Sequence, residues 1–358
     1  MRFYDFDNLP KNRVNTVVAE YIWIDGTGIN LRSKSRTLPG PIKSVNDIPA
    51  WNYDGSSTEQ ATTANSELLL EPDAFFPDPF RGGDNILVLC STYVWSDKSF
   101  SGTEPANTNF RHFSRYVNME AAGWEPRFEL EQEYTICKKL NDFTIWPLGW
   151  PRGGFPAPEG PYYCSIGAMK CNGRAVMEAH YKACMHAGVN IVGTKAEDMP
   201  GQWEFQLGSL PGLEAADHMW VARYILCRVA EDMNLSISFN PKPVKGAWSG
   251  AACHANFSTK EMREEGGYKL IEEAVSKLEN KHKEHLEVRS GWFNSKIRSV
   301  AKETKGGSPA PRRPRRKKSS RSASAAATTP FESPPECTPT RRGTSKTGAP
   351  RLTATPTW

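Results

Sequence analysis

The sequence lacks the long apolar runs and paired cysteines that mark several classes of protein. It has no run of about 18 consecutive apolar residues, and its start has no apolar core of the signal-peptide kind. Its eight cysteines form no CxxC pair, show no zinc-ligand spacing and lie mostly in apolar stretches. These absences predict a cytoplasmic protein with reduced core cysteines and no membrane partner.

Acidic residues are scarce in the last part of the chain. Residues 306–358 contain 11 Lys and Arg against 2 Asp and Glu, whereas the whole chain has a formal net charge of only +5. The preceding residues are therefore mildly acidic. The segment 301–358 is rich in Pro, Ser and Arg and has almost no apolar anchors, which predicts a disordered basic tail.

Two folded segments are expected before this tail. Apolar runs at 17–24 and 86–90 predict strands, so residues 1–105 are interpreted as a small strand-rich domain. Residues 106–300 mix strand patterns with helical apolar spacing at 175–187, 213–233 and 260–287, and are interpreted as a second domain. The predicted fold class is α+β.

Acidic side chains alternate along the predicted strand at 128–136, which reads FELEQEYTI. In a strand, Glu129, Glu131 and Glu133 share one face and the apolar residues share the other. Carboxylates gathered in this way repel one another unless cations lie between them. One interpretation is a solvated sheet edge, and the other is a site for Mg²⁺ or Mn²⁺, which prefer oxygen ligands.

Two later segments carry further candidate ligands. Glu197 and Glu204 flank a Pro-Gly turn pair within residues 195–206, and either acid is equally interpretable as a surface residue. His254 lies among small residues at 249–259, which let the backbone approach a ligand closely. The alternative for His254 is a structural histidine.

Six runs, in order along the chain, resemble the eukaryotic-type (type II) glutamine synthetase family. They cover roughly residues 15–290 and read WNYDGSST at 51–58, EQEYT at 131–135, GPYYC at 160–164, GT at 193–194, MPGQWEFQ at 199–206 and CHANFST at 253–259. The resemblance implies a β-grasp-like N-terminal domain and a catalytic domain built on a curved antiparallel sheet flanked by helices. It also implies a homo-oligomeric ring, a decamer, with active sites between subunits.

The same resemblance implies a reaction and its participants. ATP phosphorylates the γ-carboxylate of glutamate, and ammonia from ammonium then displaces phosphate to give glutamine, with Mg²⁺ or Mn²⁺ as cofactor. Carried over motif by motif, one metal is held by Glu133, Glu197 and Glu204. Glu131 and His254 hold the nucleotide-facing metal. This interpretation requires no nucleic-acid partner.

The resemblance assigns roles to further residues as well. Asp54, donated by the adjacent subunit, helps bind ammonium and takes its proton, so the catalytic set comprises Asp54, Glu131 and Glu133. Gly250 and its neighbour Ser249 are substrate-binding candidates for glutamate. The remaining candidates are nucleotide-binding residues, namely Tyr163 and Ser258.

The chain also departs from the family pattern. Lys195 replaces a residue that is commonly Asn, Ser249 replaces Asn, and Gly is usual at the positions of Ala252 and Glu129. The larger departure is the C-terminus, where the family continues with NExRLTG, HET, NRGxSxRIP and GYxEDRRPASNxDPY. These runs supply arginines for the phosphates, and none of them occurs here. We therefore expect little biosynthetic activity from this chain.

The tail is interpretable as an out-of-frame version of that family C-terminus. With free choice of synonymous codons, the shifted frame spells Y[LF]EDRRPASNCDPY from 343–358, GNERRLTG from 302–310 and SVRIP from 329–334. The reading frame would change between about residues 288 and 302. A genuine basic tail is the alternative to this frame change.

Two other functions stay open at this stage. One is a non-catalytic assembly partner that binds metal or ATP. The other is nucleic-acid binding through the basic run at 312–318, although this run has no interleaved aromatic residues for base stacking.

Overall fold

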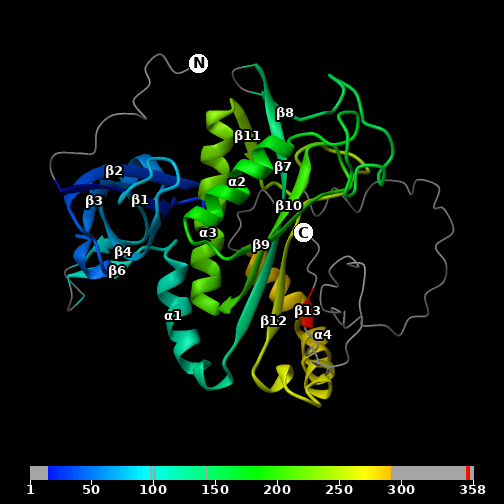
Figure 1. The fold of residues 1–358 in the computed structure, drawn as a ribbon. Coiled ribbons are helices and arrows are strands. Elements are labelled where there is room, and N and C mark those ends of the chain that lie inside the picture. Colours follow the sequence, from blue (N-terminus) through cyan, green and yellow to red (C-terminus); the bar gives the residue numbers. More distant parts are fainter. Residues whose placement is uncertain (1–14, 97–98, 100–101, 142–143, 292–351, 355–358) are drawn as a thin grey trace, which may run out of the picture. The chain divides into compact units, whose positions relative to one another are not determined.

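The computed structural model describes residues 15–96, 99, 102–141, 144–291 and 352–354 (Figure 1). The chain divides into two compact units, residues 1–113 with 182–189 and residues 114–181 with 190–358. The predictions for the N-terminal 14 residues, for Cys337 and for the tail as far as residue 351 lie outside the described residues. Within the tail, Leu352–Ala354 form a short strand, β13, where the sequence predicted disorder.

The described part of the first unit contains one six-stranded mixed sheet in the order β2-β1-β5-β4-β3, with β6 paired to β5. β1 and β5 are parallel, and the other pairings are antiparallel. The strands are β1 (Thr16–Ile24), β2 (Leu31–Pro39), β3 (Trp51–Asp54), β4 (Glu67–Pro77), β5 (Ile86–Trp95) and β6 (Thr103–Pro105). The strands predicted at 17–24 and 86–90 are confirmed. The second continues beyond the apolar run because Ser91 and Thr92 are also buried in the sheet.

Alternation along these strands builds the core of the first unit. Val17, Ala19, Tyr21 and Trp23 are buried in a single cluster with apolar residues of β4 and β5. Every second residue of β1 therefore faces this core, as the two-residue period of a strand requires.

The described part of the second unit is built on a seven-stranded antiparallel sheet centred on β7 (Arg127–Asn141). The main order is β13-β12-β7-β10-β9, and β8 and β11 also pair with β7. The remaining bounds are β8 (Thr144–Pro147), β9 (Ile191–Ala196), β10 (Gln202–Pro211), β11 (Leu235–Ser238) and β12 (Cys253–Ser258). The strand predicted at 128–136 is confirmed, and it forms the first part of β7, which continues to Asn141.

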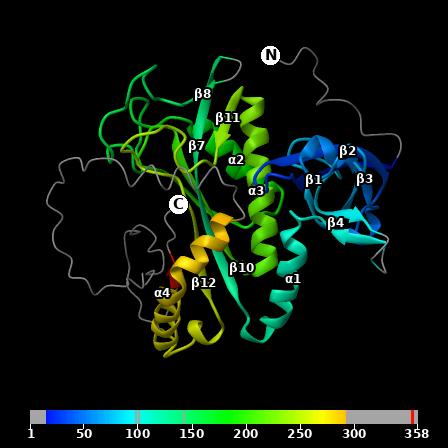
Figure 2. The same cartoon turned by 180° about the vertical axis from the view of Figure 1, so that it is seen from behind.

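Helices flank this sheet, and the predicted helices are confirmed as α2 (Arg174–His186) and α3 (Gly212–Asp232). α3 packs against β7, β10 and β11, and it lies along the sheet in Figure 2. His180 of α2 packs on Phe205 of β10 with ring centroids 5.0 Å apart. Phe205 and its alternate neighbours Trp203 and Leu207 are fully buried, so the intervening side chains of β10 face the other side of the sheet.

The predicted helix at 260–287 begins later than the charge pattern indicates. Residues Glu261–Arg263 form a 3₁₀ turn, and α4 spans Tyr268–Gly291. Gly266 adopts a left-handed φ of 84°, and a Cβ on Gly267 would lie 2.5 Å from the carbonyl oxygen of Met262. These two glycines separate the turn from α4, because an α-helix cannot pass through a left-handed residue. α1 (Phe110–Glu120) precedes β7 in the chain.

The cysteines that the structure describes are free thiols, but only Cys90, Cys137 and Cys184 are buried. Cys227 lies in an apolar stretch of α3 and is nevertheless exposed, because neighbouring positions on a helix point in different directions. The prediction that most cysteines are core residues was therefore wrong for the described part of the chain. Across the described residues, no helix combines the length and apolar character that a membrane crossing requires.

Candidate metal and active site

Strand register brings the predicted acidic residues together on one face of the β7 sheet. Glu133 of β7 pairs directly with Glu204 of β10, and Glu131 pairs directly with His254 of β12. Residues directly opposite in an antiparallel pair share a face. This face is opposite to the one that carries Phe205 and packs against helices, so its polar side chains do not interrupt the core.

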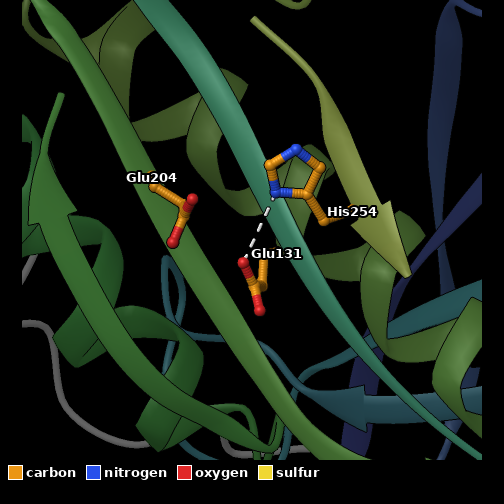
Figure 3. A group of neighbouring side chains, drawn as sticks. All are labelled: Glu131, Glu204 and His254. Atoms are coloured by element: carbon orange, nitrogen blue, oxygen red, sulfur yellow. Dashed lines mark ion pairs between the residues drawn. The ribbon is translucent and has the colours of Figure 1, made fainter. Parts of the chain in front are cut away.

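The ligand atoms of these residues form two groups. Glu131, Glu204 and His254 make the first acidic group, drawn in Figure 3, and Glu133, Glu197 and Glu204 make the second acidic group. Within each group, the oxygen or nitrogen atoms lie within 4.8 Å of one another. Glu204 belongs to both. The structure thus brings together all five residues predicted as metal ligands, and their function as ligands stays a prediction.

In the first acidic group, Glu131 is held by two neighbours on β12. His254 Nδ1 lies 3.5 Å from Glu131 Oε2, and Asn256 Nδ2 donates a hydrogen bond of 2.8 Å to Glu131 Oε1. The contact with His254 lowers the pKa of Glu131. The same contact raises the pKa of His254. Glu131 is therefore ionised at neutral pH, which is the form that binds a cation.

Glu204 is the most deeply buried acid of the site, with a side chain that is 1% exposed. Its Oε1 accepts a 2.7 Å hydrogen bond from Gln206 Nε2. Its Oε2 accepts no hydrogen bond from the described residues and lies 3.3 Å from Lys195 Nζ. Buried carboxylates are costly unless cations compensate them, and the three carboxylates of the second group can carry more negative charge than the one Lys195 ammonium balances. The second group offers only carboxylate oxygens, and the first group offers carboxylate oxygens and one imidazole. Both sets of ligand atoms therefore fit divalent metal ions.

The other two acids of the second group resist ionisation because they are removed from water. Burial raises the pKa of Glu133, although the Ala252 backbone N–H donates a 2.6 Å hydrogen bond to its Oε2. Burial likewise raises the pKa of Glu197 to about 7. The Glu197 carboxyl can therefore release a proton when a metal ion binds near neutral pH.

The raised pKa of Glu197 predicts a specific pH dependence of stability. A carboxyl whose pKa rises on folding stabilises the folded state below its unfolded pKa, and this contribution is lost as pH rises through the folded value. Without divalent metal, the free energy of unfolding should therefore fall more steeply from about pH 4.5 to about pH 7 in the parent chain than in Glu197→Gln. Urea unfolding in the presence of a chelator measures this difference. Equal slopes would contradict the prediction, and added Mg²⁺ should reduce the difference because it binds the ionised carboxylate.

Asp54 belongs to the first unit, so its position relative to the two acidic groups stays a prediction. Trp51–Asp54 form β3, which pairs with β4. Asp54 ends this strand and accepts hydrogen bonds from the backbone N–H and the hydroxyl of Ser56, at 2.9 and 2.7 Å. These bonds, and one from the Ser57 hydroxyl, lower the pKa of the exposed Asp54 carboxyl.

Hydrogen bonds connect the predicted glutamate-binding residues to the segments that carry Glu197 and Glu204. Ser249 Oγ donates a 3.3 Å hydrogen bond to Asp198 Oδ2, one residue after Glu197. The Gly250 carbonyl accepts a 3.0 Å hydrogen bond from Gln202 Nε2, at the start of β10. These bonds hold the 249–250 segment beside the strand that carries Glu204.

The predicted nucleotide-binding residues differ in their surroundings. The ring of Tyr163 is half exposed and lies 5.2 Å from Lys195 Nζ. Ser258 is buried at the end of β12, where its hydroxyl accepts a 3.0 Å hydrogen bond from Arg263. The Tyr163 side chain is therefore accessible from solvent, whereas the Ser258 hydroxyl is already engaged by Arg263.

Sequence reasoning assigned no role to three residues that the structure places at the site: Lys195, Gln206 and Asn256. Each contacts a candidate ligand, and each occupies an alternate position on its strand. The two-residue period could have identified Gln206 from Glu204 and Asn256 from His254. On the opposite face of β7, the guanidinium of Arg223 in α3 donates a hydrogen bond to Oε1 of Gln132, the residue between Glu131 and Glu133.

Glutamates and a histidine that could together hold a metal ion fit the class of proteins that bind divalent metals through carboxylates. Residues 111–277 match the family described as "Glutamine synthetase, catalytic domain". The chain is 53% identical over 272 residues to glutamine synthetase PR-1 of Phaseolus vulgaris, covering 75% of this chain and 74% of that relative. It is 51% identical over 286 residues to glutamine synthetase cytosolic isozyme 1-5 of Arabidopsis thaliana, covering 79% and 78%.

A third relative extends the comparison beyond the cytosolic isozymes. The chain is 49% identical over 292 residues to the chloroplastic/mitochondrial glutamine synthetase of Arabidopsis thaliana, covering 78% of this chain and 66% of that relative. The chain belongs to the eukaryotic-type glutamine synthetase family. The family prediction made from the six motifs is thereby confirmed, and the enzyme class is glutamate–ammonia ligase. The alternative functions are not favoured by these similarities.

Proposed function

We propose that the acidic face of the β7 sheet is the catalytic metal centre for ATP-dependent ligation of ammonia to L-glutamate. The observation that carries this proposal is the convergence of Glu131, Glu133, Glu197, Glu204 and His254 into two groups that share Glu204. When bound there, Mg²⁺ or Mn²⁺ would neutralise phosphoryl oxygens and orient the phosphate donor. The chain's own residues bind these ions, glutamate and ATP, and the product forms by way of γ-glutamyl phosphate.

Within this proposal the two acidic groups have different tasks. The second group would hold one ion through Glu133, Glu197 and Glu204. The burial of the Glu197 and Glu204 side chains keeps this ion away from bulk water. The first group presents Glu131 and His254 to the nucleotide-facing ion. Tyr163 contacts the nucleotide, Ser258 supports that end of β12, and the 249–250 segment contacts glutamate.

Asp54 is proposed to attract ammonium and to accept its proton. The hydrogen bonds from Ser56 and Ser57 that lower its pKa keep the carboxylate ionised, which supports binding of a cation at an exposed position. We propose that Asp54 serves the active site of an adjacent subunit in a decameric ring. This assignment makes oligomerisation a condition for activity.

The domain assignments and the cellular location complete the proposal. We propose that residues 1–105 form a β-grasp-like domain, supported by a mixed sheet with β1 and β5 parallel. Residues 106–300 form the catalytic domain, and 301–358 form the tail. A cytoplasmic location is supported by the cytosolic isozymes among the relatives, although a chloroplastic/mitochondrial enzyme is also similar.

The tail is proposed to result from a change of reading frame. Sequencing the transcript across codons 285–358 and past the stop tests this directly. Restoration of NERRLTG and EDRRP by an insertion or deletion of one or two bases is the expected result. A transcript that confirms the present frame would show that the basic tail is genuine.

The catalytic proposal is tested with a version of the protein that carries the in-frame C-terminus. It should convert glutamate, ammonium and Mg-ATP to glutamine with release of one phosphate per product. Glu133→Gln in this version is expected to lower the rate by at least about 100-fold, because it removes a proposed ligand of the metal ion that would stabilise the transferring charge. The matched control is Glu129→Gln on the same face of β7, which should retain most of the rate. A restored protein that binds metal and ATP but forms no glutamine would overturn the proposal.

A further inference from the structure

Lys195 places a positive charge inside the second acidic group. It lies on β9 directly opposite Glu204, so the two side chains share a face of the sheet. Its Nζ hydrogen-bonds Glu197 and lies 3.3 Å from Glu204 Oε2. The side chains of Glu197 and Glu204 are only 7% and 1% exposed. The ammonium therefore occupies space between two of the three carboxylates that define this group.

The position of this ammonium is determined by several contacts. The Lys195 backbone is held in β9 by pairing with β10, and Nζ lies 5.2 Å from the centroid of the Tyr163 ring. A lysine amine that contacts two carboxylates is an ammonium ion at neutral pH, and here Nζ contacts both Glu197 and Glu204. An ammonium has no lone pair, so it cannot act as a metal ligand in that state.

The first acidic group has a different composition. Within the described residues, Glu131 forms its ion pair with His254, whose imidazole is itself a common metal ligand. Asn256 supplies the second partner of Glu131 through a neutral amide. A divalent ion entering the first group therefore meets a potential ligand, whereas an ion entering the second group meets a fixed positive charge.

We propose that Lys195 is a built-in cation that makes the two acidic groups unequal, so that a divalent ion binds first at Glu131, Glu204 and His254. The second group accepts an ion only after the ammonium has moved away. The inference rests on the proposed metal centre and adds an order of binding to it. The physical reason is that a divalent ion and an ammonium a few ångströms apart repel strongly where water is largely excluded.

Mn²⁺ binding to the full chain tests this order. Electron paramagnetic resonance counts free Mn²⁺, and calorimetry gives the affinities. The parent chain is expected to bind one Mn²⁺ tightly and a second at least about tenfold more weakly. Lys195→Met keeps the length of the side chain and removes its charge, and it should tighten the second site by about tenfold or more. Lys260→Met, which removes an exposed lysine paired with Glu125, is the matched control and should bind like the parent.

A second measurement separates metal affinity from folding. Without metal, Lys195→Met removes the cation that Glu197 and Glu204 contact, so its thermal midpoint should fall, and Mn²⁺ should raise that midpoint more than in the parent. Lys195→Arg keeps the charge and should preserve unequal sites. Two equal sites in the parent that Lys195→Met does not change would overturn the inference and leave the metal centre intact. Absence of Mn²⁺ binding in both proteins would overturn the metal centre as well.

Discussion

The purified chain is expected to form glutamine at least about 1,000-fold more slowly than the version with the in-frame C-terminus. Phosphoryl transfer depends on positive groups that stabilise the transferring charge, and a single arginine in such a role is worth about 10³ or more in rate. The family runs that supply these arginines do not occur in the chain. Glutamine and phosphate release, measured side by side for the two proteins, give the ratio.

Metal binding provides the control for this comparison. The five candidate ligands all precede residue 255, so both proteins should bind Mn²⁺ through the same acidic face. Equal Mn²⁺ occupancy with unequal rates would attribute the loss to the C-terminal residues rather than to the metal centre. Comparable rates in the two proteins would contradict the prediction and show that the arginines of the family runs are dispensable.

Glu204→Gln is expected to have the largest effect on metal binding, because Glu204 is the residue common to both acidic groups. The amide keeps the shape of the side chain but removes the charge and one oxygen. Substitution of residues that only support a metal ligand typically lowers affinity by about 10- to 100-fold, so loss of a shared ligand should lower it by at least about 100-fold. Titration with Mn²⁺ measures the change, and the upward shift of the thermal midpoint by Mn²⁺ should disappear with it.

The appropriate control for Glu204→Gln is Glu129→Gln. Glu129 alternates with Glu131 along β7 and pairs with Asn256, yet it belongs to neither acidic group. Its substitution removes the same charge from the same sheet and should leave the tight Mn²⁺ site in place. Similar losses in the two variants would mean that the total charge of the face, and not a specific ligand, determines metal binding.

Local periodicity accounts for much of the fold that could be predicted. The spacing of Glu129, Glu131 and Glu133 at every second position predicted both the strand and the face that these acids share, because a strand has a two-residue period. The apolar spacing of α2 and α3 was equally informative. The prediction of an early start for α4 failed where Gly266 and Gly267 interrupt a charged pattern that otherwise continues.

Tertiary structure decided how the candidate ligands combine. The sequence alone determined the ligand types, their order along the chain and the family to which they point. Only the pairing of β7 with β10 and β12, and of β10 with β9, made Glu204 common to two groups and placed Lys195 between carboxylates. Strand register is a long-range property, and a shift of one residue would turn each side chain to the other face. For that reason the sequence shows that a lysine is substituted at position 195, whereas only the folded sheet shows that it lies between two carboxylates.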